Sequence, residues 1–136
     1  MKHTIIRDFI ALSLLAFVSC RKSDTSKVMP EPTPTATITI ASPTTDQTFR
    51  LGDIMNISAV IEGNVKLHGY HLAIVNTATG DTVFKADDHT HALTLNVAAD
   101  WQCDVSSSSD LKLCISSALN HDGLEVVKTV SFKAAP

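Results

Sequence analysis

Apolar and polar residues alternate along most of the chain after residue 36, and a period of two residues is typical of half-buried β-strands. In the clearest stretch, from Met55 to Ile61, every second residue is apolar. Another stretch places Leu93, Leu95 and Val97 on one face, which we expect to point into a core. The pattern predicts seven strands in all, at 37–40, 54–61, 67–76, 82–86, 92–99, 111–119 and 124–133.

The segments between these strands carry the residues that turns require. Glu62-Gly63-Asn64 and Thr79-Gly80-Asp81 are each expected to turn the chain, and 120–123 (Asn-His-Asp-Gly) is a strong hairpin signal. The polar run 104–110 is expected to be the longest loop. Seven short strands without a helical period of useful length predict an all-β fold, an antiparallel sandwich of two sheets.

The first 20 residues have the layout of a secretory signal. The stretch Phe9 to Val18 is apolar except for one serine, and as a helix it would rise about 15 Å, half of a bilayer core. Ser19 and Cys20 follow, and then the polar run RKSDTSK. This layout resembles a bacterial lipobox, although Phe17 stands where leucine is usual. The resemblance implies cleavage after residue 19 and acylation of Cys20; an ordinary signal peptide with a free cysteine is the alternative.

Residues 21–36 contain three prolines and no apolar period, so they predict a solvated, extended tether. The expected organisation is therefore a signal peptide at 1–19, a lipidated cysteine with its tether at 20–36, and one β-sandwich domain at 37–136.

Several phrases in this last region resemble known domains. The segment 38–61, ITIASPTTDQTFRLGDIMNISAVI, is similar to the opening of bacterial immunoglobulin-like domains. The segments 67–74 (LHGYHLAI), 87–95 (DDHTHALTL) and 119–132 (LNHDGLEVVKTVSF) resemble a group of uncharacterised Bacteroidota lipoproteins with such a domain. The resemblance implies an immunoglobulin-like sandwich in the cell envelope, anchored by lipid to the outer membrane, on its periplasmic face or at the cell surface. It implies no particular chemistry.

Composition limits the partners. The net charge of −3 provides no basic surface for nucleic acid, so the membrane is expected to be contacted through the N-terminal lipid. The chain has three cysteines, and acylation of Cys20 would leave Cys103 and Cys114 as a pair in an oxidising compartment. We expect a disulfide between these two residues, with two free thiols as the alternative.

Histidine is the candidate for chemistry. Five of the six histidines lie after residue 36, and imidazole is a frequent ligand of Zn and Cu. In a sandwich, the start of the strand at 67–76, the region before 92–99 and the last hairpin should meet at one end. We therefore expect some of these side chains to converge at that end, as hydrogen-bonded caps of the sandwich or as solvated turn residues. The first alternative is a Zn or Cu site that they form together with Asp87, Asp88 or Asp122. The candidate ligands are His68, His89, His91 and His121. His71 is expected to point to the opposite face of the strand from His68. A pH-responsive or ligand-contacting surface is the remaining alternative.

No catalytic motif is present: the chain lacks Gly-x-Ser-x-Gly and a phosphate-binding glycine loop. We expect a non-enzymatic envelope lipoprotein that binds or assists an unknown protein or glycan partner. No cofactor is expected unless the histidines hold Zn or Cu. A surface adhesin or glycan-binding module is a further alternative, because an exposed Trp101 could stack on a sugar, although packing of Trp101 at the rim of the core is the stronger expectation.

Overall fold

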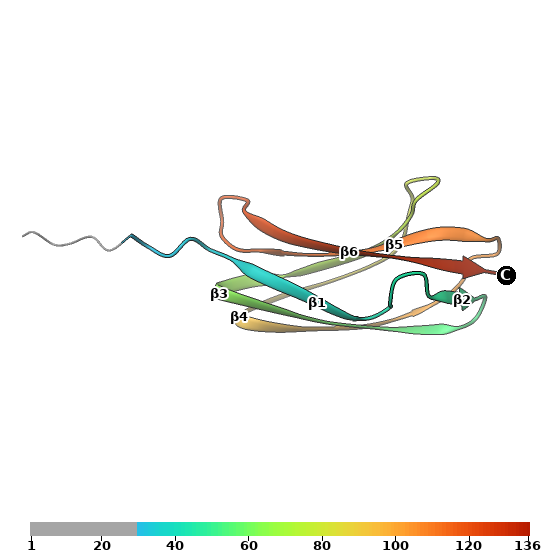
Figure 1. Ribbon diagram of the computed structural model, residues 1–136, viewed down its shortest axis with the longest axis horizontal. Coiled ribbons are helices and arrows are strands. Elements are labelled where there is room, and N and C mark those ends of the chain that lie inside the picture. The colour runs from blue at the N-terminus through green and yellow to red at the C-terminus, as the bar shows by residue number, and fades with distance from the viewer. Residues whose placement is uncertain (1–29) are drawn as a thin grey trace, which may run out of the picture. The chain divides into compact units, whose positions relative to one another are not determined.

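The computed structural model describes residues 30–136, so the expected signal segment and Cys20 lie outside the described residues. Residues Pro32–Pro136 form one compact unit (Figure 1). Within residues 30–136, no helix is long and apolar enough to cross a membrane. The strands are β1 (Ala36–Ser42), β2 (Thr48–Arg50), β3 (Ile54–Asn76), β4 (Thr82–Gln102), β5 (Ser109–Ala118) and β6 (Glu125–Ala135).

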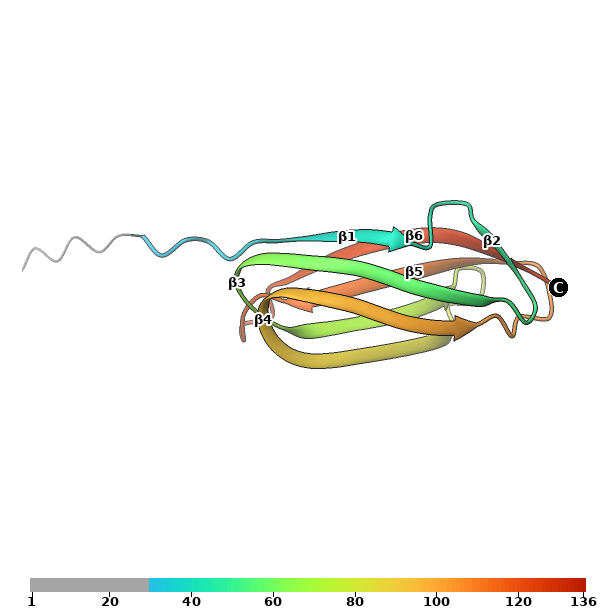
Figure 2. The ribbon, with the colours of Figure 1, turned by 90° about the horizontal axis from the view of Figure 1, so that it is seen from below.

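The domain has two layers because β3 and β4 bend and run through both of them (Figure 2). In one layer, the first part of β3 pairs with β1 on one side and with 94–102 of β4 on the other. In the other layer, 67–76 of β3 lies between 82–92 of β4 and β5, and β6 follows β5. The short β2 pairs with β6 in parallel. The arrangement is an immunoglobulin-like β-sandwich.

The strand count differs from the expectation of seven. The segments 54–61 and 67–76 belong to one strand, and so do 82–86 and 92–99. Glu62-Gly63-Asn64 does not form a separate tight turn: these residues stay within β3, which bends there into the other layer, and the pairing with β4 shifts between Glu62 and Leu67. The chain changes layers by bending rather than by a tight turn. The three-residue β2 was not predicted, because it is too short to show a period.

The core lies between the layers and confirms most of the expected inward positions. Leu95 and Val97 are buried, but Leu93 is 54% exposed, so the expectation that it faces the core is wrong. Between the pairs Glu62–Thr94 and Leu67–Ala92, β4 supplies Leu93 alone while β3 supplies residues 63–66. Leu93 thus lies where the strands change layers and has no paired neighbour. The most buried side chains include Met55, Ile57, Ile61, Leu67, Leu72, Ile74, Leu111, Leu113, Ile115 and Phe132.

The expected disulfide is absent, because Cys103 and Cys114 are both free. Leu113 and Ile115 point into the core, so the alternation of β5 directs Cys114 to the outer face of its sheet. Cys103 is buried just after β4, where its main chain exchanges hydrogen bonds with Gly52 and Asp53. The Cys103 side chain is therefore buried, whereas the Cys114 side chain lies on the outer face of its sheet.

A bulge in the β3–β4 pair changes which residues face the core. His68 pairs with His91 and Tyr70 pairs with Asp88, so the single residue Gly69 lies opposite two residues of β4. Gly69 has φ +80°, and a Cβ atom there would collide with the backbone of Asp88. Its carbonyl accepts a 2.6 Å hydrogen bond from the buried hydroxyl of Ser117. Glycine is required at this position for both conformation and space.

We expect Gly69→Ala to lower the free energy of unfolding by about 1–3 kcal/mol or more, from backbone strain combined with the collision. Gly80→Ala is the matched control, because Gly80 has φ +79° but nothing lies within 4 Å of a Cβ there. Urea unfolding of both variants measures the difference. Equal losses in the two variants would contradict a steric role for Gly69.

Candidate functional site

Four imidazoles from three elements meet at one end of the sandwich. The ring centroids of His68 and His91 are 4.7 Å apart, those of His68 and His121 are 4.3 Å apart, and those of His89 and His91 are 5.1 Å apart. His68 lies on β3, His89 and His91 lie on β4, and His121 lies in the β5–β6 turn. We call these four residues the histidine cluster. The four candidate ligands from the sequence are thus neighbours in space.

The β3–β4 bulge positions the first three rings. His68 and His91 are directly opposite each other in the ladder, so their side chains are adjacent. Beyond them, the carboxylate of Asp88 accepts a 2.7 Å hydrogen bond from the backbone N–H of His89 and a 2.9 Å hydrogen bond from the hydroxyl of Thr90. These bonds fix His89 and Thr90, the two bulge residues that lie opposite Gly69. Asp88 therefore has a structural role next to the imidazoles.

The fourth ring is held by the β5–β6 turn. The side-chain oxygen of Asn120 accepts hydrogen bonds from the backbone N–H of Asp122, at 3.1 Å, and of Leu124, at 3.0 Å. Leu119 donates its backbone N–H to the carbonyl of Leu124 at 2.8 Å, which closes the turn. Asn120 thus acts as the turn residue that brings His121 against His68.

His68 has the most unusual environment in the cluster. Its Nδ1 is buried and has no hydrogen-bond partner. Burial lowers the pKa of His68 below its ordinary value of 6.5, and the other imidazoles of the cluster lower it further, because a proton on any of them repels one on His68. A neutral ring with an unpartnered nitrogen is suited to accept a ligand that supplies positive charge.

Other candidate residues stay outside the cluster. His71 is exposed and pairs with Asp87 and Ser116 in the two neighbouring strands. Asp87 and Asp122 are also exposed. Among residues 30–136, no group of three or more His, Cys, Asp or Glu side chains is arranged around a common point as metal ligands are. The imidazoles instead contact one another edge to face.

Trp101 is only 4% exposed, and its ring packs against Phe132 with centroids 6.1 Å apart. The expectation that it packs at the core is confirmed. A buried indole cannot stack on a sugar, so the glycan-binding alternative loses the residue on which it depended.

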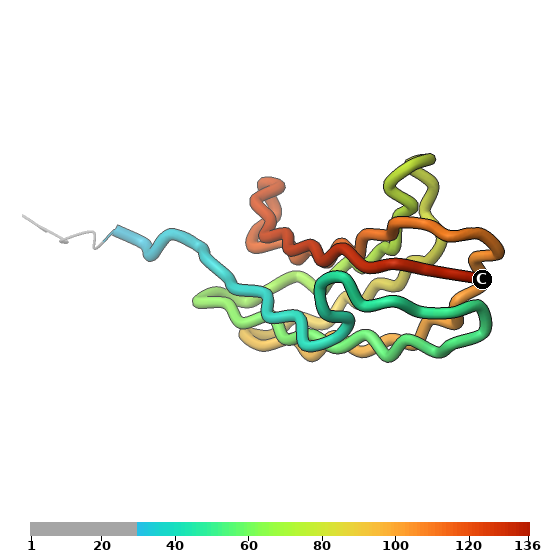
Figure 3. The backbone as a smooth tube through the Cα atoms, turned by 45° about the vertical axis from the view of Figure 1, so that its right-hand side comes forward, coloured from blue at the N-terminus to red at the C-terminus, as the bar shows by residue number. Residues whose placement is uncertain are grey.

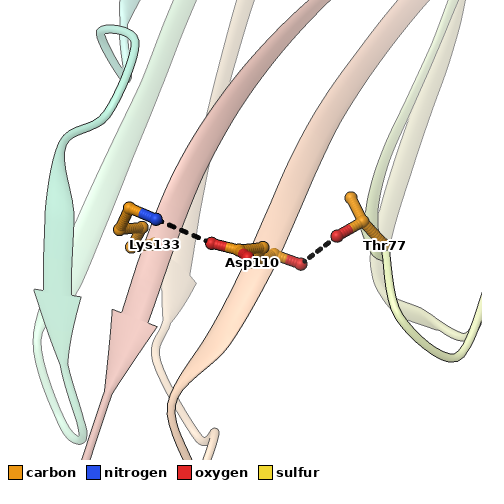
Figure 4. A network of polar contacts seen from close by, with 3 residues as sticks. All are labelled: Thr77, Asp110 and Lys133. Carbon is orange, nitrogen blue, oxygen red and sulfur yellow. Dashed lines mark hydrogen bonds and ion pairs between the residues drawn. The ribbon is translucent and has the colours of Figure 1, made fainter.

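A second polar group was not anticipated from the sequence. Lys133 of β6 forms a 2.9 Å ion pair with Asp110 of β5, whose carbonyl accepts a 2.9 Å hydrogen bond from the Thr77 hydroxyl (Figure 4). A cavity of about 330 Å³ lies beside this pair, between β2, β5 and β6. The hydrogen bond to Asp110 raises the pKa of Lys133. Both side chains are more than half exposed, so the pair is a weak surface contact rather than a built ligand site.

Comparisons with known proteins assign the chain to no family. No family model matches the chain, and no curated protein matches it. Among solved structures, the fibronectin(III)-like modules of Clostridium thermocellum CbhA are similar, with 21% sequence identity and a TM-score of 0.48. That similarity covers 73% of this chain and 96% of the other chain.

The lowered pKa of His68 predicts a stability that depends on pH. The unfolded chain takes up a proton near pH 6.5, whereas the folded chain resists protonation until a lower pH. The unfolded state therefore binds more protons in this window, and the free energy of unfolding should fall as the pH drops from 6.5 toward the folded-state pKa. Above pH 6.5 this contribution is complete.

Urea unfolding between about pH 8 and pH 5 measures this effect. His68→Gln should show a shallower loss of stability on acidification, and His71→Gln, an exposed residue outside the cluster, should behave as the wild type. If His68→Gln and the wild type lose equal stability over this range, the assignment to His68 is wrong.

Proposed function

We propose that the chain is a non-enzymatic binding module anchored to the outer membrane of the cell envelope, and that its ligand is a divalent Zn or Cu ion held by the histidine cluster. The observation that carries this proposal is the meeting of four imidazoles from three separate elements. The sequence contains no catalytic motif, which supports binding rather than turnover.

The spacing of the rings supports a metal. With Zn–N distances of about 2.0–2.1 Å and tetrahedral angles, the centroids of two imidazoles on one ion lie about 5 Å apart. Three ring pairs of the cluster, with separations of 4.7, 4.3 and 5.1 Å, are close to this value. To bind one ion, the side chains would have to rotate so that their nitrogens point toward a common position. His89, His91 and His121 are exposed, and exposed side chains change rotamer on a fast timescale.

The imidazole nitrogens of the cluster favour Zn and Cu over other divalent metals. A metal needs neutral imidazole, and the low pKa of His68 keeps this ring neutral at pH 7. Nitrogen ligands suit Zn and Cu better than Mg or Ca, which prefer oxygen. The carboxylate of Asp88 is engaged in the bulge. A site built from three or four nitrogens is the arrangement that we propose.

The anchor is proposed on Cys20, from the lipobox-like sequence. Within the domain, the side chain of Asn64 holds the entering chain: it accepts a hydrogen bond from the N–H of Thr35 and donates one to the carbonyl of Thr33. Asn64 lies four residues before His68. The chain therefore enters the domain at the end that carries the histidine cluster, beside the β5–β6 turn (Figure 3).

Calorimetric titration of the metal-free domain with Zn²⁺ and with Cu²⁺ tests the ligand. We expect binding tighter than about 100 μM. His68→Ala and His91→Ala should each weaken it by at least about tenfold, because each removes a central ligand. His71→Ala is the matched control and should bind as the wild type does. Absence of binding below about 100 μM, or equal affinities in all four proteins, would contradict the metal proposal.

Metabolic labelling with a fatty-acid analogue tests the anchor separately. We expect the wild type to be labelled and its mature N-terminus, by mass spectrometry, to be an acylated Cys20. Cys20→Ala should lose the label, and Cys114→Ala should keep it. An unacylated mature chain would leave a secreted domain and contradict the anchor without affecting the metal proposal.

A further inference from the structure

The β5–β6 turn contains a chemically reactive pair, Asp122 followed by Gly123. The amide nitrogen of a residue can attack the side-chain carboxyl carbon of a preceding aspartate, and the ring that closes is a five-membered succinimide. A side chain on the attacking residue hinders this approach, so glycine permits it best. The chain has five glycines, and Gly123 is the only one that follows an aspartate or an asparagine.

The structure leaves the attacking nitrogen unengaged. The side-chain oxygen of Asn120 accepts hydrogen bonds from the N–H groups on either side of it, those of Asp122 and Leu124. The N–H of Gly123 lies between them and donates to no acceptor within residues 30–136. Asp122 and Gly123 are exposed, and nothing lies within 4 Å of a Cβ built at Gly123. Neither a hydrogen-bond partner nor a neighbouring atom therefore opposes ring closure.

The carboxyl group of Asp122 is also weakly held. Within the part of the chain that the structure describes, its one polar contact is a 3.5 Å hydrogen bond from the side-chain amide of Asn120, longer than an ordinary bond of this type. Asp46, another exposed aspartate in a turn, differs in the residue that follows it. The backbone N–H of Gln47 donates a 3.2 Å hydrogen bond to the carbonyl of Thr44. The nitrogen next to Asp46 is therefore engaged and carries a side chain.

We propose that Asp122 isomerises to isoaspartate and that this modification removes His121 from the histidine cluster. The nitrogen of Gly123 attacks Cγ of the neutral carboxyl group of Asp122. A C–N bond forms, and the hydroxyl leaves as water together with the proton of the N–H. Water then adds to one of the two ring carbonyls and breaks its bond to the nitrogen. Cleavage at Cγ restores aspartate, and cleavage at the main-chain carbonyl gives isoaspartate. Water is the only co-reactant.

Isoaspartate directs the main chain through the side-chain carbons, so it adds one carbon to the backbone of the turn. Asn120 binds the N–H groups of Asp122 and Leu124 with a single oxygen, which requires the native spacing between them. His121 lies inside this turn, and its ring centroid is 4.3 Å from that of His68. A longer turn therefore separates the two rings. The reaction requires no metal, and only a loss of metal binding as its consequence would depend on the proposed function.

Prolonged incubation of the purified full chain at neutral pH in EDTA tests the modification. Peptide mapping by mass spectrometry, with enzymatic methylation of isoaspartate, locates the product. We expect isoaspartate at Asp122 and not at Asp46. Asp122→Glu keeps the charge but would need a six-membered ring, so it should reduce methylation of the turn peptide at least about tenfold. Asp46→Glu is the matched control and should isomerise at Asp122 as the wild type does.

Nuclear magnetic resonance of the imidazole protons tests the consequence for the cluster. In the isomerised fraction the signals of His68 and His121 should shift, and those of the exposed His71 should not. EDTA is present throughout, so the outcome does not depend on whether the cluster binds metal. Absence of isoaspartate at Asp122, or equal amounts at Asp122 and Asp46, would overturn the proposal. Isomerisation that leaves the signals of His68 and His121 unchanged would overturn it as well.

Discussion

The structure depends on the pairing of two long strands, β3 and β4. Each strand runs through both layers, so one antiparallel ladder connects the sheets that enclose the core. β1 joins this pair in one layer, and β5, followed by β6, joins it in the other. Because the same two strands form part of both layers, the register between them determines which side chains face inward on each side.

The register between β3 and β4 shifts at three places, between Glu62 and Leu67, between His68 and Tyr70, and between Ile74 and Val75, and the first two shifts have consequences for the surface. At residues 63–66 the strands pass between layers, and Leu93 is left without a paired neighbour and exposed. At Gly69 the bulge changes which residues of β3 point into the core. The odd-numbered Leu67 is buried before the bulge, and the even-numbered Leu72 is buried after it. The register that holds between these two shifts places His68 directly opposite His91. The histidine cluster is thus a product of strand register as much as of composition.

The sequence predicted the sandwich and the four residues of the cluster, because alternation and turn residues are local signals. It did not reveal that Glu62-Gly63-Asn64 continues a strand, since glycine and asparagine favour a turn when judged alone. Only tertiary pairing shows that the chain bends there. The sequence did contain a signal for the bulge. The apolar residue is odd-numbered at Leu67 but even-numbered at Leu72 and Ile74, and Gly69 lies between them. The roles of Asp88 and Asn120 depend on hydrogen bonds that the sequence pattern does not specify.

In the metal-free state, the close packing of the histidine cluster costs free energy. Packing four imidazoles together buries a nitrogen of His68 without a partner, and such a group costs folding free energy. Protonation would add charge repulsion to this cost, so the cluster is most stable when neutral. A bound cation would satisfy the nitrogen and convert the close spacing from a source of repulsion into a source of ligands. The Gly69 bulge and the Asn120 turn position the backbone that carries the rings through hydrogen bonds that involve none of the imidazoles.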